Sequence, residues 1–248
     1  MIKKFKSYYL FFVSLVIGLL QIPFAFAKSA TGNKLFFLSD STVNSKKTDS
    51  LHLIPVIKSV YDSLHLNIKG LKSQVYEYAK KGFDILQHEG RLLNDSIISI
   101  IDFSLPSSEK RLFVIDIKNY KVIFQTLVAH GRNTGKEIAN TFSNNASSYM
   151  SSPGFYITGT TYEGKNGYSL KLEGIEAGIN DNAFERGIVV HGAPYVSQEL
   201  ANAQGYIGRS QGCPAVPVQY SENIINTIKN GTCLFIYHSS YISRSTLL

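Results

Sequence analysis

The chain has 248 residues, of which 44% are hydrophobic and 17% charged, and its formal net charge is +7 at pH 7. Three lysines and no acidic residue fall within residues 1–27, so the rest of the chain carries +4, with its basic residues scattered. This mild, dispersed charge, without a basic stripe or a recognisable module, argues against nucleic-acid binding. It would suit an anionic polymer as partner, although an ordinary solubilising charge would look the same.

Residues 1–27 have the organisation of a signal peptide. Three lysines open the segment, residues 8–20 are largely apolar, and Ala25 and Ala27 place small residues where a signal peptidase reads. The apolar run is short for a membrane span, although a non-cleaved anchor is the alternative. We therefore expect export across a membrane, with membrane contact only during that export.

Two further segments precede the main body. Residues 28–50 are rich in Ser, Thr, Lys and Asn, which predicts a linker. Residues 51–93 are predicted to be a helical lead-in, because apolar residues recur at helical spacing on both sides of a break at residues 67–70. The pattern leaves open whether this lead-in packs on the body or stands apart as a lid or docking element.

After residue 94 the pattern changes to β-branched and aromatic runs, which predict strands. The expected strands are residues 97–101, 111–117, 122–128, 155–160, 168–172, 188–190 and 233–237, and a late helix is expected over residues 218–229. Since strands and helices do not alternate, the pattern argues against a doubly wound sheet and favours an α+β, β-rich fold. We expect residues 94–240 to form the body and residues 241–248 to be a tail.

Two short segments of the body carry chemically distinctive residues. Residues 188–192 are an apolar strand that ends in a His-Gly pair, and residues 208–215 place Cys213 in a turn rich in glycine. A nucleophilic cysteine needs a base that takes its proton, and N–H groups that face the developing oxyanion. Gly212 leaves room beside the thiol and permits a tight turn. His191 is suited to be the base if the two segments are neighbours.

Other interpretations of these residues are open at this level. Cys213 and Cys233 are the two cysteines of the chain, so one disulfide is the simplest alternative in an oxidising compartment. Cys233 begins an apolar strand, where a buried and inert thiol is common. His130, His191 and Cys213 could in principle bind zinc, but no matching zinc motif is present, and we expect neither a metal nor another cofactor.

The same segments, with several others in a fixed order, resemble the catalytic domain of murein L,D-transpeptidases, YkuD-like enzymes of the bacterial cell wall. The resemblance runs from about residue 100 to residue 237 and is closest to the branch whose cysteine motif reads Gly-Cys-Pro-Ala. The other segments that carry it are Ile-Asp-Phe-Ser at 101–104, Val-Ala-His-Gly-Arg at 128–132, Phe-Ser-Asn at 142–144, Gly-Phe-Tyr at 154–156, Gly-Tyr-Ser-Leu at 167–170 and Asn-Asp at 180–181. The cysteine motif alone would be only moderately specific.

The resemblance implies a β-sandwich or barrel body and an enzyme that acts on peptidoglycan stem peptides in the periplasm or at the cell wall. Cys213 would attack the carbonyl at the L-centre of diaminopimelate, and His191 would be the general base and acid. The backbone N–H groups of Gly212 and Cys213 would form the oxyanion hole, with Ser210 and Gly192 in the same motifs. The resulting thioester would pass to an amine on a neighbouring stem, a lipoprotein or a D-amino acid.

Water as the acceptor would instead make the enzyme an L,D-carboxypeptidase, and a peptidoglycan-binding module with a degenerate site is the non-enzymatic alternative. The chain also departs from many members of the wider family, which have an arginine just after the cysteine, where Pro214 and Ala215 stand here. Arginine binds carboxylates with a specific forked geometry. Arg209 is the expected replacement. Other candidates for substrate binding are His130, Arg132, Arg186, Tyr168 and Tyr195. For each of them an ordinary structural role is the alternative.

Overall fold

The computed structural model describes residues 59–248. The expected signal peptide, the linker and the first residues of the lead-in lie outside the described residues, so these three predictions stay predictions. Within the described part, no helix is both long enough and apolar enough to span a membrane.

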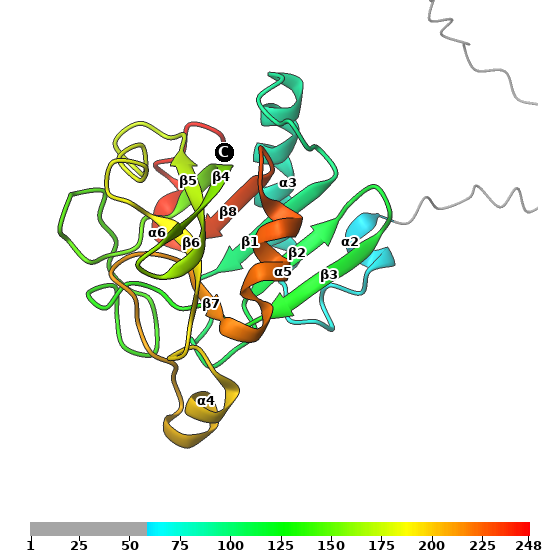
Figure 1. Cartoon of the computed structure of the whole chain (residues 1–248). Helices are drawn as coiled ribbons and strands as arrows, with labels where there is room; N and C mark the ends of the chain where they lie inside the picture. Colours follow the sequence, from blue (N-terminus) through cyan, green and yellow to red (C-terminus); the bar gives the residue numbers. More distant parts are fainter. Residues whose placement is uncertain (1–58) are drawn as a thin grey trace, which may run out of the picture. The chain divides into compact units, whose positions relative to one another are not determined.

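A single eight-stranded sheet forms the body, as Figure 1 shows. Its strands are β1 (Ile97–Asp102), β2 (Leu112–Asp116), β3 (Lys121–Thr126), β4 (Gly154–Gly164), β5 (Gly167–Gly174), β6 (Val189–Ala193), β7 (Ala215–Pro217) and β8 (Cys233–Tyr237). They lie in the order β3-β2-β1-β8-β4-β5-β6-β7, with parallel pairing only between β1 and β8 and between β6 and β7. Each predicted strand is present, and β7 is an additional strand.

The two edges of this sheet approach each other. Just beyond β3, the backbone N–H of Ala129 donates a hydrogen bond of 2.8 Å to the carbonyl oxygen of Ala215 in β7. The sheet is therefore a nearly closed barrel. With its few helices it confirms the predicted α+β, β-rich fold and the barrel body that the resemblance implied.

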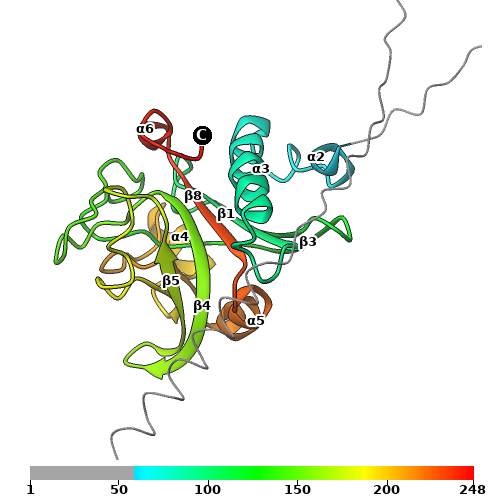
Figure 2. The same ribbon diagram turned by 90° about the horizontal axis from the view of Figure 1, so that it is seen from above.

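The helices of the described part are α2 (Val60–Ser63), α3 (Ser73–His88), α4 (Gln198–Gln204), α5 (Val218–Ile228) and α6 (Ser239–Ile242). Of these, α3 and α5 cover opposite faces of the central strands, as seen in Figure 2. In β1, Ile98 and Ile100 belong to the core cluster under α3, whereas Ile97 and Ile101 belong to the cluster under α5. This alternation follows from the two-residue period of a strand.

The lead-in helix α3 is thus part of the main core, which answers the question that the sequence left open. Six of its residues are buried. At Gly82 the helix approaches β4 so closely that an added Cβ would lie 2.1 Å from Cζ of Phe155. The described part of the lead-in, residues 59–93, therefore packs on the barrel and does not stand apart as a lid.

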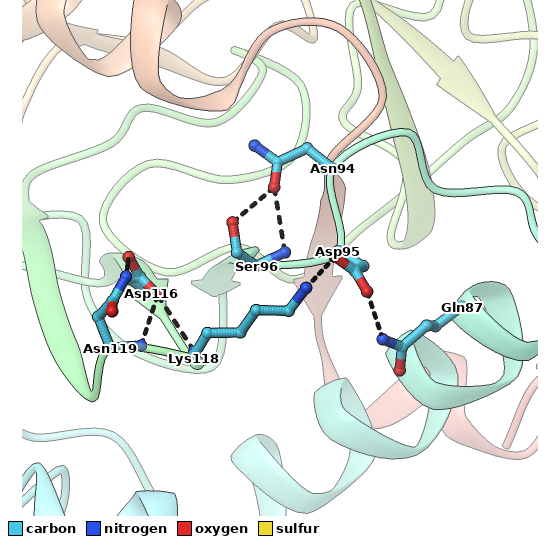
Figure 3. A network of polar contacts seen from close by, with 7 residues as sticks. All are labelled: Gln87, Asn94, Asp95, Ser96, Asp116, Lys118 and Asn119. Atoms are coloured by element: carbon cyan, nitrogen blue, oxygen red, sulfur yellow. Dashed lines mark hydrogen bonds and ion pairs between the residues drawn. The ribbon is translucent and has the colours of Figure 1, made fainter.

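A surface network also joins α3 to the strands (Figure 3). The side-chain amide of Gln87 donates to Asp95, and Lys118 forms an ion pair with the same carboxylate. In the predicted turn after β2, the carboxylate of Asp116 accepts the backbone N–H groups of Lys118 and Asn119. Such exposed pairs contribute little stability individually, so the network mainly fixes local geometry.

The C-terminal residues, expected to be a tail after residue 240, pack on the barrel. Tyr241 in α6 is buried, and its hydroxyl donates to the carboxylate of Glu176, which is also buried. The hydroxyl of Ser245 donates to the other oxygen of this carboxylate at 2.6 Å. Residues 241–245 therefore continue the body beyond the expected boundary, because they satisfy a buried charge.

Candidate active site

Cys213 lies in a tight turn that leads into β7. The Ser210 hydroxyl donates to the carbonyl oxygen of Cys213 at 2.6 Å, and its oxygen accepts the backbone N–H of Gly212 at 3.0 Å. Gly212 has a φ of +123°, and an added Cβ would lie 2.8 Å from the carbonyl oxygen of Met150. Glycine is therefore required at this position both by its backbone conformation and by the available space.

This turn corrects part of the predicted oxyanion hole. The N–H of Gly212 is already engaged by Ser210 and is not free to bind an oxyanion in this conformation. The N–H of Cys213 makes no hydrogen bond within residues 59–248. Of the two donors implied by the resemblance, Cys213 itself is the available one, and Ser210 shapes the turn.

His191 is a buried residue of β6, between β5 and the parallel strand β7. Its Nδ1 lies 2.9 Å from the carbonyl oxygen of Gly192. Because a carbonyl oxygen can only accept, Nδ1 carries the proton, and Nε2 of the neutral ring is left as a base. Burial lowers the pKa of His191, which favours this neutral form. Gly192 is required nearby, since an added Cβ would lie 2.7 Å from Oγ of Ser221.

The thiol of Cys213 is free and buried, and Cys233 is free and buried as well. The disulfide alternative is therefore wrong for this structure. Burial raises the pKa of the Cys213 thiol, whereas the backbone N–H of Val189 and the guanidinium of Arg186 act in the opposite direction. The resting pair is thus best described as a neutral thiol beside a neutral imidazole.

Cys213 and His191 line the same pocket, which has a volume of about 520 Å³. Within the described part of the chain no hydrogen bond joins the two side chains, and the thiol is instead directed to the carbonyl oxygen of Gly187, at 3.7 Å. Hydrogen bonds between catalytic groups are often long before substrate binds. In this conformation the thiol proton is therefore not shared with the ring.

The pocket is positively charged. Among its described lining residues, Lys165, Arg186 and Arg209 are basic and none is Asp or Glu. Its remaining lining includes Tyr149 and Tyr195. Such a lining favours an anionic ligand.

The predicted substrate-binding residues differ in where they lie. Arg209 lines the pocket and is exposed. Tyr168 lines an adjoining pocket of about 440 Å³ that also includes His191. Arg132 lies over the ring of Tyr149, with its guanidinium carbon 3.9 Å from the ring centroid, so it supports the pocket wall from outside.

His130, by contrast, is a core residue, and its predicted role in binding substrate is corrected. Its ring is fully buried, with Nδ1 2.8 Å from Nη2 of Arg111 and Nε2 3.2 Å from the carbonyl oxygen of Gly135. Since arginine can only donate, Nδ1 accepts and Nε2 carries the proton. The backbone carbonyl of His130 accepts the N–H of Ser210 at 3.0 Å, so this residue supports the cysteine turn from behind.

Several residues near the site were not found from the sequence. Lys165 and Asn166, at the tip of the β4–β5 hairpin, line the pocket although the sequence shows only a glycine-rich turn there. Ser151 accepts the N–H of Gly131 and donates to the carbonyl oxygen of Gly212, which ties the cysteine turn to its neighbour. Within residues 59–248, no three His, Cys, Asp or Glu side chains converge as metal ligands.

Comparisons with known proteins place this site in a family. The model of the L,D-transpeptidase catalytic domain matches residues 67–237. A comparison with curated proteins gives no match.

Solved structures that this chain matches include L,D-transpeptidase 3 from Mycobacterium tuberculosis, at 13% identity and a TM-score of 0.36, over 58% of this chain and 61% of that one. The L,D-transpeptidase from Mycobacterium smegmatis matches at 11% identity with a TM-score of 0.37, over 58% of this chain and 59% of that one. The helical cell shape determining protein Pgp2 from Campylobacter jejuni matches at 14% identity with a TM-score of 0.40, over 65% of this chain and 56% of that one. The chain thus spans less than two thirds of the length of these proteins. On the family match, which covers more than half of its residues, the chain belongs to the L,D-transpeptidase catalytic domain family.

Proposed function

We propose that this chain is a peptidoglycan L,D-transpeptidase in which Cys213 forms a thioester with the donor stem peptide. The observation that carries the proposal is the pairing in one pocket of a free thiol with a histidine whose Nδ1 is held by a carbonyl. That hydrogen bond orients the ring and leaves Nε2 as the base. A buried structural cysteine would not require such an arrangement.

In the first step, Nε2 of His191 takes the thiol proton while the sulfur of Cys213 attacks the carbonyl at the L-centre of diaminopimelate. The backbone N–H of Cys213 is the available donor to the oxyanion. As the tetrahedral intermediate collapses, the bond to the terminal D-alanine breaks. His191 returns its proton to the departing amine, which leaves an acyl-thioester.

In the second step, the amine of a neighbouring stem attacks the thioester carbonyl, loses a proton to His191, and expels the thiolate, which is then reprotonated. The product is a 3-3 cross-link. A lipoprotein lysine or a free D-amino acid would react in the same way. Transfer to an amine is favoured by the adjoining pocket with Tyr168, because this pocket offers a second approach to His191.

The charge of the pocket supports a stem peptide as substrate. Diaminopimelate-containing stems carry several free carboxylates, and the basic residues of the lining give the pocket a complementary positive charge. No cofactor enters this chemistry. We also propose that residues 1–27 direct export, so that the enzyme meets its substrate in the periplasm or at the cell wall.

The test is mass spectrometry of muropeptides after incubation of purified peptidoglycan with the wild type, Cys213→Ala and Cys233→Ala. We expect 3-3 dimers with the wild type and with Cys233→Ala, a matched control that removes the buried thiol outside the pocket. Cys213→Ala should give none. Tripeptide stems without dimers would indicate the L,D-carboxypeptidase. Unchanged peptidoglycan in all three samples, or full activity of Cys213→Ala, would refute the proposal, and the former would favour a binding module.

A further inference from the structure

Arg186 occupies an unusual position beside the nucleophile. The residue is partly buried, and its guanidinium lies between the loop of residues 143–152 and the cysteine turn. Nη2 would lie 3.5 Å from a Cβ added to Gly212, the residue before Cys213. The guanidinium therefore borders the pocket at the level of the thiol.

Nearly all hydrogen-bond donors of this guanidinium are already used. Nη1 donates to the carbonyl oxygen of Ser143 at 2.8 Å and to Oγ of Ser152 at 2.6 Å. Nη2 donates to Oγ of Ser148 at 3.2 Å and to the carbonyl oxygen of Met150 at 2.6 Å. Arginine has five N–H groups, so only the one on Nε is left. The N–H groups on Nη1 and Nη2, which would bind a carboxylate as a forked pair, are therefore not free.

The acceptors of Arg186 are all neutral oxygens, and none of the ion pairs within residues 59–248 includes this residue. Its charge is therefore fixed in position and not neutralised by a carboxylate. Arg209 differs, because its Nη1 makes only contacts of 3.4 and 3.5 Å to backbone carbonyls, and its other donors are free for a ligand.

The remaining titratable groups of the pocket do not supply this charge. His191 is neutral in the resting state because burial lowers its pKa, and burial raises the pKa of Tyr195 to about 12, so its hydroxyl is neutral as well. Lys165 is carried by the hairpin tip, and Arg209 by an exposed stretch of chain. Arg186 is thus the fixed cation of the pocket.

We propose that Arg186 is a positioning residue whose fixed charge stabilises the Cys213 thiolate, while substrate carboxylates are bound by Arg209. The inference rests on the proposed function for its role in catalysis. The stabilisation of the thiolate itself can be measured without any transpeptidase activity. An opposite charge fixed in the same pocket favours the ionised thiol and so increases its reactivity at neutral pH.

The test is the rate of alkylation by iodoacetamide as a function of pH, in a Cys233→Ala background so that only Cys213 reacts. The alkylation rate rises with pH as the thiol ionises, and Arg186→Gln should move the midpoint of this rise to higher pH and slow alkylation at pH 7 about tenfold. Arg186→Lys, which keeps the charge and loses the forked hydrogen bonds, should stay near the wild type. Arg209→Gln, the matched control, should leave the midpoint unchanged and raise KM for a stem peptide.

A second variant avoids removing the arginine, in case Arg186→Gln does not fold. Ser148→Asp places a carboxylate beside Nη2, which should neutralise the guanidinium and slow alkylation in the same way, whereas Ser148→Asn should not. The proposal is overturned if Arg186→Lys and Arg186→Gln shift the midpoint equally, which would indicate a structural role, or if Ser148→Asp leaves it at the wild-type pH. If the alkylation profiles change as predicted but the wild type forms no cross-links, the proposed function fails while the inference about Arg186 stands.

Discussion

Replacing His130 by glutamine is expected to make the protein less sensitive to acid. Burial and the neighbouring Arg111 guanidinium lower the pKa of His130 from 6.5 to about 4. The native protein therefore keeps this ring neutral at pH values where the unfolded chain protonates it. Since the unfolded state then binds more protons, the free energy of unfolding falls as the pH decreases from 6.5 to 4.

The size of this effect follows from the difference between the two pKa values. A change from 6.5 to about 4 corresponds to about 3 kcal/mol of stability that is present above pH 6.5 and lost progressively toward pH 4. Glutamine keeps the geometry, because its oxygen can accept from Arg111 and its amide can donate to the carbonyl oxygen of Gly135. It does not titrate, so this part of the pH dependence should disappear.

The assay is urea unfolding at a series of pH values between 4.5 and 7.5, followed by circular dichroism because the chain has no tryptophan. His130→Gln costs stability at pH 7.5 through imperfect packing, but its decline with acid should be shallower than that of the wild type by about 2–3 kcal/mol over this range. His88→Gln, at the exposed end of α3, is the control and should follow the wild type. Parallel pH profiles for the wild type and His130→Gln would refute the reasoning.

Three further changes test other parts of the structure. Gly82→Ala places a methyl group against Phe155 and should push α3 away from the sheet. We expect the free energy of unfolding in urea to fall by about 1–3 kcal/mol. An unchanged urea midpoint would contradict the close packing of α3 on β4. Tyr241→Phe removes one hydrogen-bond donor to the buried Glu176 carboxylate and should lower the free energy of unfolding by about 1–3 kcal/mol. A variant as stable as the wild type would mean that the C-terminal residues are not held at this carboxylate. Burial lowers the pKa of His191, so the acid limb of the pH profile of kcat/KM for stem-peptide turnover should have its midpoint below pH 6.5. A midpoint of this limb at or above pH 7 would show that the His191 ring is not the general base.

Much of the fold could be predicted because strand propensity and burial agree along the chain. Strand β6 begins with an apolar run that is buried, and the late helix places its isoleucines on one face, as expected. The strand β7 could not be predicted, because Ala215–Pro217 has no local strand signal and is defined by its pairing with β6 and by the bridge to Ala129. Helix α4 is short and largely polar, and it too has little signal in the sequence.

The sequence predicted that Cys213 and His191 belong to one site, and the structure places both in the lining of one pocket. The site was not predictable where the answer depends on tertiary contacts. The sequence could not show that Ser210 occupies the N–H of Gly212, because that depends on a side-chain rotamer. Nor could it show that the ring of His130 is buried against Arg111, since Arg111 begins one predicted strand, His130 follows another, and both could as well have faced the solvent.

The proposed chemistry requires that the sulfur of Cys213 forms a covalent acyl-enzyme with the donor stem. The most direct measurement is intact-protein mass spectrometry after mixing the protein with a diaminopimelate-containing tetrapeptide stem without an acceptor. We predict an added mass equal to the tripeptide acyl group on Cys213, released by hydroxylamine as expected for a thioester, present in Cys233→Ala and missing in Cys213→Ala. An adduct that persists in Cys213→Ala, or turnover of the stem by that variant, would contradict the account.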